Sequence, residues 1–229
     1  MELKARIFHI IPKPIINNLL LTVPLLYRTR LVNYETNLSD EHGIEELLDA
    51  LNKTSDIKGD IIECGSARCG ATVIMANYLL SQKSDKKIYA CDTFGGFDTS
   101  ELEEEQKAGL TNEPKNAFKH SSYEYVKKKI KRLGLSNIFL VKGLFENTLP
   151  KLNNVFSLAL IDCDLRKSII HSAEIIWPNL SSGGIMLFDD YTSTKFKGAK
   201  LGIDFVVKKF TDEIQESRLL NRLYYICKK

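Results

Sequence analysis

Two groups of aspartates end neighbouring predicted strands, and their residue type and spacing suit metal chemistry. Asp162 and Asp164 follow one apolar run, and Asp189 and Asp190 follow the next one. Carboxylates that meet at one edge of a sheet repel one another, which raises their pKa values unless a cation is present. Carboxylate oxygens are the ligands that Mg²⁺ and similar hard ions prefer. Helix capping accounts for one of these acids but not for four, so the pattern favours a divalent metal site.

A second pair of acids indicates a different kind of ligand. Glu63 lies at the carboxyl end of the first predicted strand, and Asp92 lies at the end of the second. A carboxylate beside a glycine turn would repel a pyrophosphate, but it suits a ligand with a cationic amino-acid end. The carboxylate of Asp92 can accept hydrogen bonds from both hydroxyls of a ribose. S-adenosylmethionine (SAM) has both of these features.

The stretch of residues 59–80, GDIIECGSARCGATVIMANYLL, must hold such a ligand. Asp60–Cys64 is predicted as a buried strand, Gly65 and Gly70 bracket a turn, and residues 71–80 are predicted as a helix. Glycines let the backbone approach a ligand, and parallel strands bind small molecules at their carboxyl ends. The chain has no GKS or GKT, which argues against a nucleoside triphosphatase. It also has no GxGxxG turn here, which argues against a nicotinamide-dependent dehydrogenase.

The rest of the chain alternates predicted strands and helices, which is typical of a mainly parallel sheet covered on both faces. Gly183 and Gly184 are predicted to follow the end of a helix, before a short strand. Gly143 begins a turn, where a glycine lets an adenine edge approach the backbone. The predicted strands are 87–92, 137–142, 157–162, 185–188 and, antiparallel, 221–228; the predicted helices are 40–53, 123–133, 145–152, 167–177 and 198–210.

Three charged segments have plainer interpretations. Residues 93–122 form a polar insertion punctuated by glycine, and loops of this length are often lids or binding loops. Within it, ELEEEQK (101–107) is predicted to be a solvent-facing part of a helix. The segment KKKIKR (127–132) is predicted to face solvent as well, the alternative being that it attracts an anionic substrate or nucleotide-sugar.

Composition sets the broad class. With 229 residues, of which 44% are hydrophobic and 27% charged, the chain is predicted to form one globular domain. We expect this domain at residues 40–229, after an extension at residues 1–39. The net charge of +3 gives no reason to expect a nucleic-acid partner. The five cysteines lack zinc-site spacing and are expected to be reduced core thiols of a cytoplasmic protein, a Cys64–Cys69 redox pair being the alternative.

The first 31 residues are apolar, but Pro12, Lys13, Pro14 and Pro24 interrupt them. This composition argues against a membrane span and against a secretory signal. We expect a helical extension that packs on the domain or on a second subunit of a homo-oligomer. Basic residues flank the apolar ones, so the alternative is an anchor in the membrane interface.

A divalent ion and SAM together suggest a reaction. The ion would bind a substrate hydroxyl and lower its pKa, and a carboxylate would remove the proton. Asp162 is the best candidate for this base. The hydroxyl oxygen would then attack the sulfonium methyl group, and S-adenosylhomocysteine (SAH) would leave.

Six segments of the chain resemble the macrocin O-methyltransferase (TylF-like) family of class I SAM-dependent methyltransferases. They are GDIIECGSARCG, CDTFGGF, VKGLFENTLP, LIDCDLRKS, LSSGGIMLFDDY and KGAKLGIDFVVKKF. Their order and spacing also match, from about residue 33 to the C-terminus. The resemblance implies an α/β, Rossmann-like class I methyltransferase fold with a mainly parallel seven-stranded sheet and helices on both faces. It also implies Mg²⁺-dependent methylation of a hydroxyl of a sugar or glycosylated small molecule.

The resemblance also implies site residues. Metal ligands are expected at Asp162, Asp189 and Asp190, with Asp162 also the base. The chain departs from the family at Arg166, where an aromatic residue is usual, and this change is expected near the acceptor pocket. A turn at 95–97 also lacks the usual acid and proline. The expected SAM-binding residues are Glu63, Gly65, Ser66, Gly70, Asp92, Thr93 and Gly143.

The alternative function is a catalytically silent scaffold that docks through its N-terminal segment.

Overall fold

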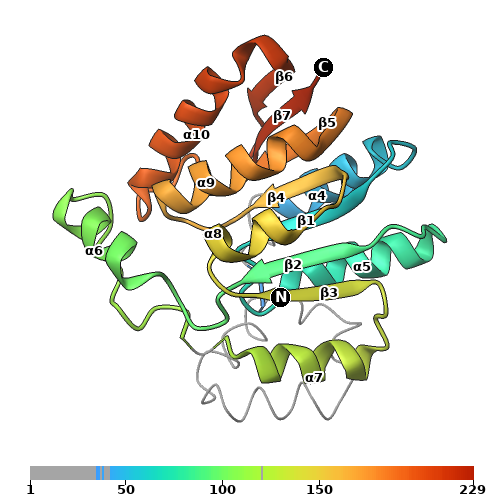
Figure 1. The fold of residues 1–229 in the computed structure, drawn as a ribbon, viewed down its shortest axis with the longest axis horizontal. Helices are drawn as coiled ribbons and strands as arrows, with labels where there is room; N and C mark the ends of the chain where they lie inside the picture. Colours follow the sequence, from blue (N-terminus) through green and yellow to red (C-terminus); the bar gives the residue numbers. More distant parts are fainter. Residues whose placement is uncertain (1–34, 37, 39–41, 120) are drawn as a thin grey trace.

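The structure is a computed structural model that describes residues 35, 36, 38, 42–119 and 121–229 of the chain. A seven-stranded sheet with the order β3-β2-β1-β4-β5-β7-β6 runs through its centre (Figure 1). Strands β1 to β5 pair in parallel, and β7 runs antiparallel to both β5 and β6. The strands are β1 (Asp60–Cys64), β2 (Ile88–Asp92), β3 (Ile138–Lys142), β4 (Phe156–Ile161), β5 (Leu180–Phe188), β6 (Ile214–Leu219) and β7 (Tyr224–Lys228).

Side chains of the central strands alternate between the two faces of the sheet, and each face has its own hydrophobic core. Ile61 of β1 packs into a core with residues of α4, α5 and α7, whereas Ile62 packs into a core with residues of α9 and α10. The sheet is therefore covered by helices on both faces, as predicted. The helices are α4 (Gly43–Lys53), α5 (Gly70–Ser81), α6 (Thr99–Lys107), α7 (Tyr123–Leu133), α8 (Phe145–Thr148), α9 (Arg166–Ile176) and α10 (Lys197–Lys209).

The chain direction within the sheet creates the place for a site. From β1 the chain proceeds to β2 and β3 on one side, and then returns to β4 and β5 on the other. In open α/β sheets, ligands bind in the crevice outside the carboxyl ends of the strands where the order reverses. Here that crevice lies beyond the ends of β1 and β4.

Two strand predictions need correction. Strand β5 begins at Leu180, so Gly183 and Gly184 lie inside a strand and not before it. The pairing of β5 with β4 shifts register over this stretch, and Gly183 has a φ of 73°, so the glycines form an irregular bulge. The resemblance implied a seven-stranded sheet, but no segment was predicted as strand β6. Its residues are polar and mostly exposed at the sheet edge, so they show no apolar alternation.

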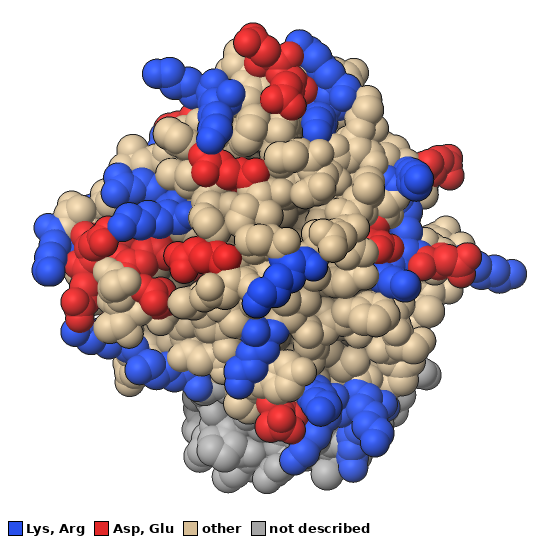
Figure 2. All heavy atoms as spheres, viewed as in Figure 1, with Lys and Arg blue, Asp and Glu red and all other residues tan. Residues whose placement is uncertain are grey.

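Charged side chains of both signs are scattered over the face of the molecule that Figure 2 shows. Both charged helices nevertheless bury residues that were predicted to face solvent. Lys129 of α7 is 1% exposed, although the adjacent Lys127 and Lys128 are exposed. Glu105 of α6 is 4% exposed. These residues lie on the inward faces of their helices, together with buried apolar residues such as Leu102 and Val126. Burial of Lys and Glu requires ionic or hydrogen-bonding partners.

All five cysteines are free thiols, four of them buried and Cys227 half-buried, as expected for core thiols. No helix in the described part of the chain is long and apolar enough to cross a membrane. The predictions for residues 1–31, a helical extension or an interfacial anchor, lie outside the described residues. The same holds for most of the segment 1–39 that was predicted to precede the domain.

Candidate functional site

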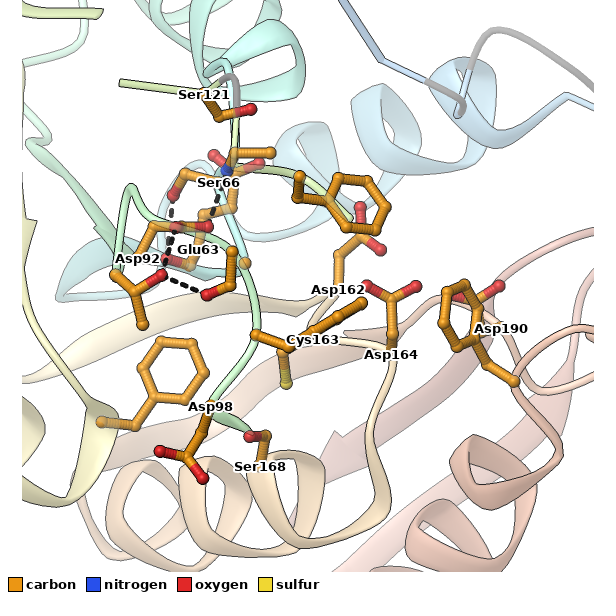
Figure 3. Close-up of a pocket in the computed structure, with 18 of the residues that line it drawn as sticks. Glu63, Ser66, Asp92, Asp98, Ser121, Asp162, Cys163, Asp164, Ser168 and Asp190 are labelled. Carbon is orange, nitrogen blue, oxygen red and sulfur yellow. Dashed lines mark hydrogen bonds between the residues drawn. The ribbon is translucent and has the colours of Figure 1, made fainter. Parts of the chain in front are cut away.

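A cavity of about 900 Å³ opens at the carboxyl ends of β1, β2, β4 and β5. Its volume is in the range of pockets that bind small molecules and cofactors. Most predicted site residues line it, from the glycine turn on one side to the aspartates on the other (Figure 3). The predicted residues in its lining are Glu63, Gly65, Ser66, Gly70, Asp92, Thr93, Asp162 and Asp190.

Gly65 allows the two halves of the site to touch. Its φ is +92°, and a Cβ at this position would lie 1.8 Å from the backbone oxygen of Asp162. The backbone nitrogen of Asp162 in turn donates a 2.8 Å hydrogen bond to the carbonyl of Cys64. Only glycine combines this backbone conformation with this contact. The turn after β1 and the acid after β4 are therefore direct neighbours.

Glu63 is an acid held away from water. Its side chain is 2% exposed and accepts a hydrogen bond from the Thr72 hydroxyl. Burial is the main cause that raises the pKa of Glu63 from 4.5 to about 7, and the charge of Asp92 adds to the effect. The carboxyl group is therefore poised to ionise when a cationic group lies beside it.

We expect this buried acid to make the stability of the ligand-free protein depend on pH. The folded pKa of about 7 exceeds the ordinary 4.5, so the folded state retains a proton that the unfolded state releases. The stabilisation is present below pH 4.5 and is lost as the pH rises through 7, a difference of ~3 kcal/mol. Urea unfolding should show wild type losing ~3 kcal/mol more than Glu63→Gln between pH 4.5 and 8. Equal losses would contradict this assignment.

Asp92 and Thr93 organise the turn after β2. The carboxylate of Asp92 accepts hydrogen bonds from the backbone nitrogens of Ala67 at 2.8 Å and Phe94 at 2.6 Å. The Oδ2 oxygen accepts only the bond from Ala67 among the described residues, so it can still accept from a ligand hydroxyl. The Thr93 hydroxyl donates to the carbonyl of Gly96 at 2.6 Å. These contacts join the ends of β1 and β2 around one carboxylate.

Gly143 lies next to the cavity lining and not in it. It has a φ of +143°, and its backbone nitrogen donates to the carbonyl of Asp92 at 3.0 Å. The three residues that follow it, Leu144, Phe145 and Glu146, line the cavity. Gly143 thus forms the turn between β3 and this part of the cavity wall.

Three aspartates meet at the other side of the cavity. Asp162, Asp164 and Asp190 each offer a carboxylate oxygen, and these oxygens lie within 4.8 Å of one another. Figure 3 shows Asp164 between the other two. Asp164 and Asp190 have φ values of 62° and 63°, in the left-handed backbone region that residues other than glycine rarely adopt. The backbone is thus strained at two residues of this group, as is common at functional sites.

Burial and mutual repulsion dominate the electrostatics of this group. Burial raises the pKa of all three carboxyl groups, and the neighbouring aspartates raise them further. The Oδ2 atom of Asp190 is buried and has no hydrogen-bond partner among the described residues. Oxygen donors of this kind fit a hard divalent cation.

Asp189 does not belong to this group of oxygens. Its carboxylate, 2% exposed, accepts two hydrogen bonds from the Arg222 guanidinium, at 2.9 and 2.7 Å. Glu46 of α4 anchors the loop that carries Arg222 by accepting from the backbone nitrogens of Asn221 at 2.6 Å and Leu223 at 2.8 Å. Asp189, a predicted ligand, therefore forms a buried bidentate ion pair with Arg222. The third carboxylate of the cluster is that of Asp164.

The sequence did not single out an aromatic wall of the cavity. Phe97, Phe118 and Phe196 line it and pack edge to face, with ring centroids 5.2 and 5.9 Å apart. They come from three separate loops, so no local pattern reveals them. Arg166, expected near this pocket, is not among the lining residues. Its backbone nitrogen donates to Glu105 at 3.1 Å.

The insertion helix α6 borders the same wall. Glu101 accepts from the backbone nitrogen of Ser168 at 2.8 Å and from its hydroxyl at 2.6 Å. Both residues line the cavity, together with Asp98. The insertion therefore contributes a wall of the cavity, and its role as a lid or binding loop stays a prediction. The sequence did not reveal that Glu101 caps the start of α9, because its partner Ser168 is 67 residues away.

Comparison with known proteins gives consistent matches. Two curated relatives from Streptomyces are each 26% identical over 144 residues: a demethyldecarbamoylnovobiocin O-methyltransferase from Streptomyces niveus and an 8-demethyl-8-(2,3-dimethoxy-alpha-L-rhamnosyl)-tetracenomycin-C 4'-O-methyltransferase from Streptomyces olivaceus. The matches cover 60% and 59% of this chain but only 54% of each relative, so the chain spans about half of their length.

Solved structures have the same fold. The O-methyltransferase NovP matches with a TM-score of 0.70 at 18% identity, over 95% of this chain and all of that one. An SAH-bound methyltransferase from Podospora anserina, PaMTH1, matches with a TM-score of 0.53 at 16% identity, over 79% and 76% of the two chains. The fold is thus the Rossmann-like fold of class I methyltransferases. A family model for macrocin-O-methyltransferase (TylF) matches residues 41–215. The chain therefore belongs to the macrocin O-methyltransferase (TylF) family.

Proposed function

We propose that the protein transfers a methyl group from SAM to a hydroxyl of a sugar or glycosylated small molecule, with Mg²⁺ or a similar divalent cation. The observation that carries this proposal is the close contact at Gly65 between two parts of the cavity. One part is the glycine turn with the buried Glu63, and the other is the cluster of three aspartates. The relative from Streptomyces olivaceus, a 4'-O-methyltransferase of a rhamnosyl compound, supports a sugar acceptor.

The cofactor would lie along the glycine turn. Glu63 would ionise beside the ammonium group of the methionine part, while Asp92 would accept from the ribose hydroxyls. Gly65 and Gly70 would let the backbone come close to the ligand, because a side chain at either position has no room. Ser66 and Thr93 would add hydroxyl groups to this wall. Gly143 would direct the wall that faces the adenine.

The metal would be held by Asp162, Asp164 and Asp190. Their oxygens are close together, their pKa values are raised, and one buried oxygen of Asp190 has no partner among the described residues. Asp189 was predicted as a ligand from the family resemblance, but its pairing with Arg222 makes Asp164 the better third ligand. When bound, the cation would supply charge stabilisation to the acceptor oxygen and lower the pKa of its hydroxyl.

Asp162 would act as the base. It lies at the junction of the two halves of the site, and its backbone contacts both Gly65 and Cys64. Its carboxylate would take the hydroxyl proton of the acceptor, and the oxygen would form a bond to the methyl carbon. The carbon–sulfur bond would break with its electrons going to sulfur, which leaves SAH and a methyl ether. The proton would then pass from Asp162 to solvent.

The aromatic wall would bind the acceptor. Phe97, Phe118 and Phe196 offer ring faces and edges to an apolar sugar face or to a ring attached to the sugar. Glu101 and Ser168, which also line the cavity, would orient the polar groups of the acceptor. Orientation of two reactants can contribute several kcal/mol to a rate enhancement.

The test is methyl transfer from SAM to a panel of free sugars, nucleotide-sugars and glycosylated small molecules, with mass-spectrometric detection of the methylated product. We expect turnover of at least one acceptor, loss of turnover in EDTA, and recovery on adding Mg²⁺. Turnover that persists in EDTA would remove the metal from the proposal. Absence of SAH binding in calorimetry would favour the silent scaffold instead.

A further inference from the structure

A buried ion cluster holds the turn of residues 66–69 at one wall of the cavity. Glu35 forms ion pairs with Lys129 of α7 at 2.6 Å and with Arg68 of the turn at 2.9 Å. The hydroxyl of Tyr125 donates to Glu35 at 2.6 Å and accepts from Arg68 at 3.0 Å. The side chains of Glu35 and Lys129 are 1% and 0% exposed. This degree of burial is rare for ionic groups and depends on their mutual contacts.

Lys129 contacts the turn at its centre. Its ammonium group donates to the backbone carbonyl of Arg68, in addition to its ion pair with Glu35. The residues on either side, Ala67 and Cys69, have φ values of 44° and 57°. Backbone in this left-handed region is unfavourable for residues with a side chain, and it persists only where surrounding contacts hold it. Lys129 supplies such a contact between the two strained residues.

Glu35 also packs directly on the turn through its backbone. A Cβ at Gly70 would lie 2.4 Å from the carbonyl oxygen of Glu35, so the two backbones are in close contact. Glu35 and Thr36 line the same cavity as Gly65, Ser66 and Ala67. Glu35 lies outside residues 41–215, which the family model matches. The wall of the cofactor cavity therefore includes a residue upstream of the matched region.

We propose that Lys129 and Glu35 are positioning residues for the cofactor: they hold the turn of residues 66–69 in its strained, cofactor-binding conformation. This inference rests on the proposed SAM-dependent function of the same cavity. Neither side chain needs to touch the ligand. Their effect passes through the Arg68 carbonyl and guanidinium, and through the hydrogen bond from the Ala67 nitrogen to Asp92 at 2.8 Å on the cavity side.

The test compares two neighbouring lysines of α7 by calorimetric titration with SAH. Lys129→Met removes the buried ammonium group, whereas Lys128→Met removes an exposed one and serves as the matched control. We expect Lys129→Met to weaken SAH binding at least about tenfold at a temperature where circular dichroism shows it folded. Lys128→Met should bind as wild type does. If Lys129→Met binds SAH within threefold of Lys128→Met while only its melting temperature falls, the role is merely structural and the inference is overturned.

Two milder variants keep the test decisive if Lys129→Met does not fold. Glu35→Gln keeps the shape of the side chain but removes its charge, and Lys129→Arg keeps the charge. We expect Glu35→Gln to weaken SAH binding by at least about threefold, with Lys129→Arg closer to wild type. Unchanged affinity in Glu35→Gln would overturn the inference. If wild type itself binds no SAH, the proposed function has failed, which is a different outcome from wild-type binding with unaffected variants.

Discussion

Replacing Asp162 with asparagine is expected to lower the rate of methyl transfer about 10³-fold, while SAH affinity stays within about threefold of wild type. Asparagine is close in shape to aspartate, so the contacts of the Asp162 backbone with Gly65 and Cys64 should persist. It cannot accept the hydroxyl proton, and it removes one negative charge from the cluster. Initial rates with the acceptor found in the panel, together with calorimetry, measure both quantities.

The matched control for this variant is Asp85→Asn. Asp85 is an exposed residue that precedes β2 and is absent from the cavity lining. We expect its rate and its SAH affinity to equal those of wild type. If Asp162→Asn retains more than about a tenth of the wild-type rate, Asp162 is not the base, since general-base catalysis contributes at least about 10²-fold.

Metal binding should depend on Asp164 and not on Asp189. Asp164→Asn is expected to weaken Mn²⁺ binding by about 100-fold, because it removes one of three converging oxygens. The paired variant Asp189→Asn with Arg222→Gln should bind Mn²⁺ within about threefold of wild type, because it removes both charges of an ion pair at once. The signal of free Mn²⁺ in electron paramagnetic resonance measures these affinities directly.

The paired substitution avoids a misleading loss of stability. Removing one partner of a buried ion pair leaves the other charge uncompensated, which costs about 3–5 kcal/mol. Asp189→Asn alone would therefore combine an effect on folding with any effect on the metal. If the paired variant loses Mn²⁺ while Asp164→Asn keeps it, the original assignment of Asp162, Asp189 and Asp190 is correct and the revised one is wrong.

Which residues reach the site was largely predictable from local sequence. Apolar runs ended by Glu63, Asp92 and Asp162 predicted strands with acids at their carboxyl ends. In a parallel sheet these ends meet at one edge, so the cavity could be predicted without knowing any long-range contact. The glycine turn after β1 was predictable for the same reason, because glycine is needed where the backbone must adopt a positive φ.

How those residues are used depended on partners far away in the chain. Asp189 and Asp190 are adjacent in sequence, yet only tertiary structure pairs Asp189 with Arg222, 33 residues away. The same holds for Lys129, which lies in a run of lysines and is buried beside Glu35, a counter-charge 94 residues away.

The sequence by itself determined the alternation of strands and helices as far as α10, the glycine turn and the edge of the sheet where the acids gather. These depend on the periodicity of side chains and on backbone conformation, both of which are local properties. The tertiary structure alone decided which carboxylates converge, which are neutralised by a cation of the chain, and which lysine is buried. The free energy of a buried charge is set by the partners around it, and these come from distant parts of the chain.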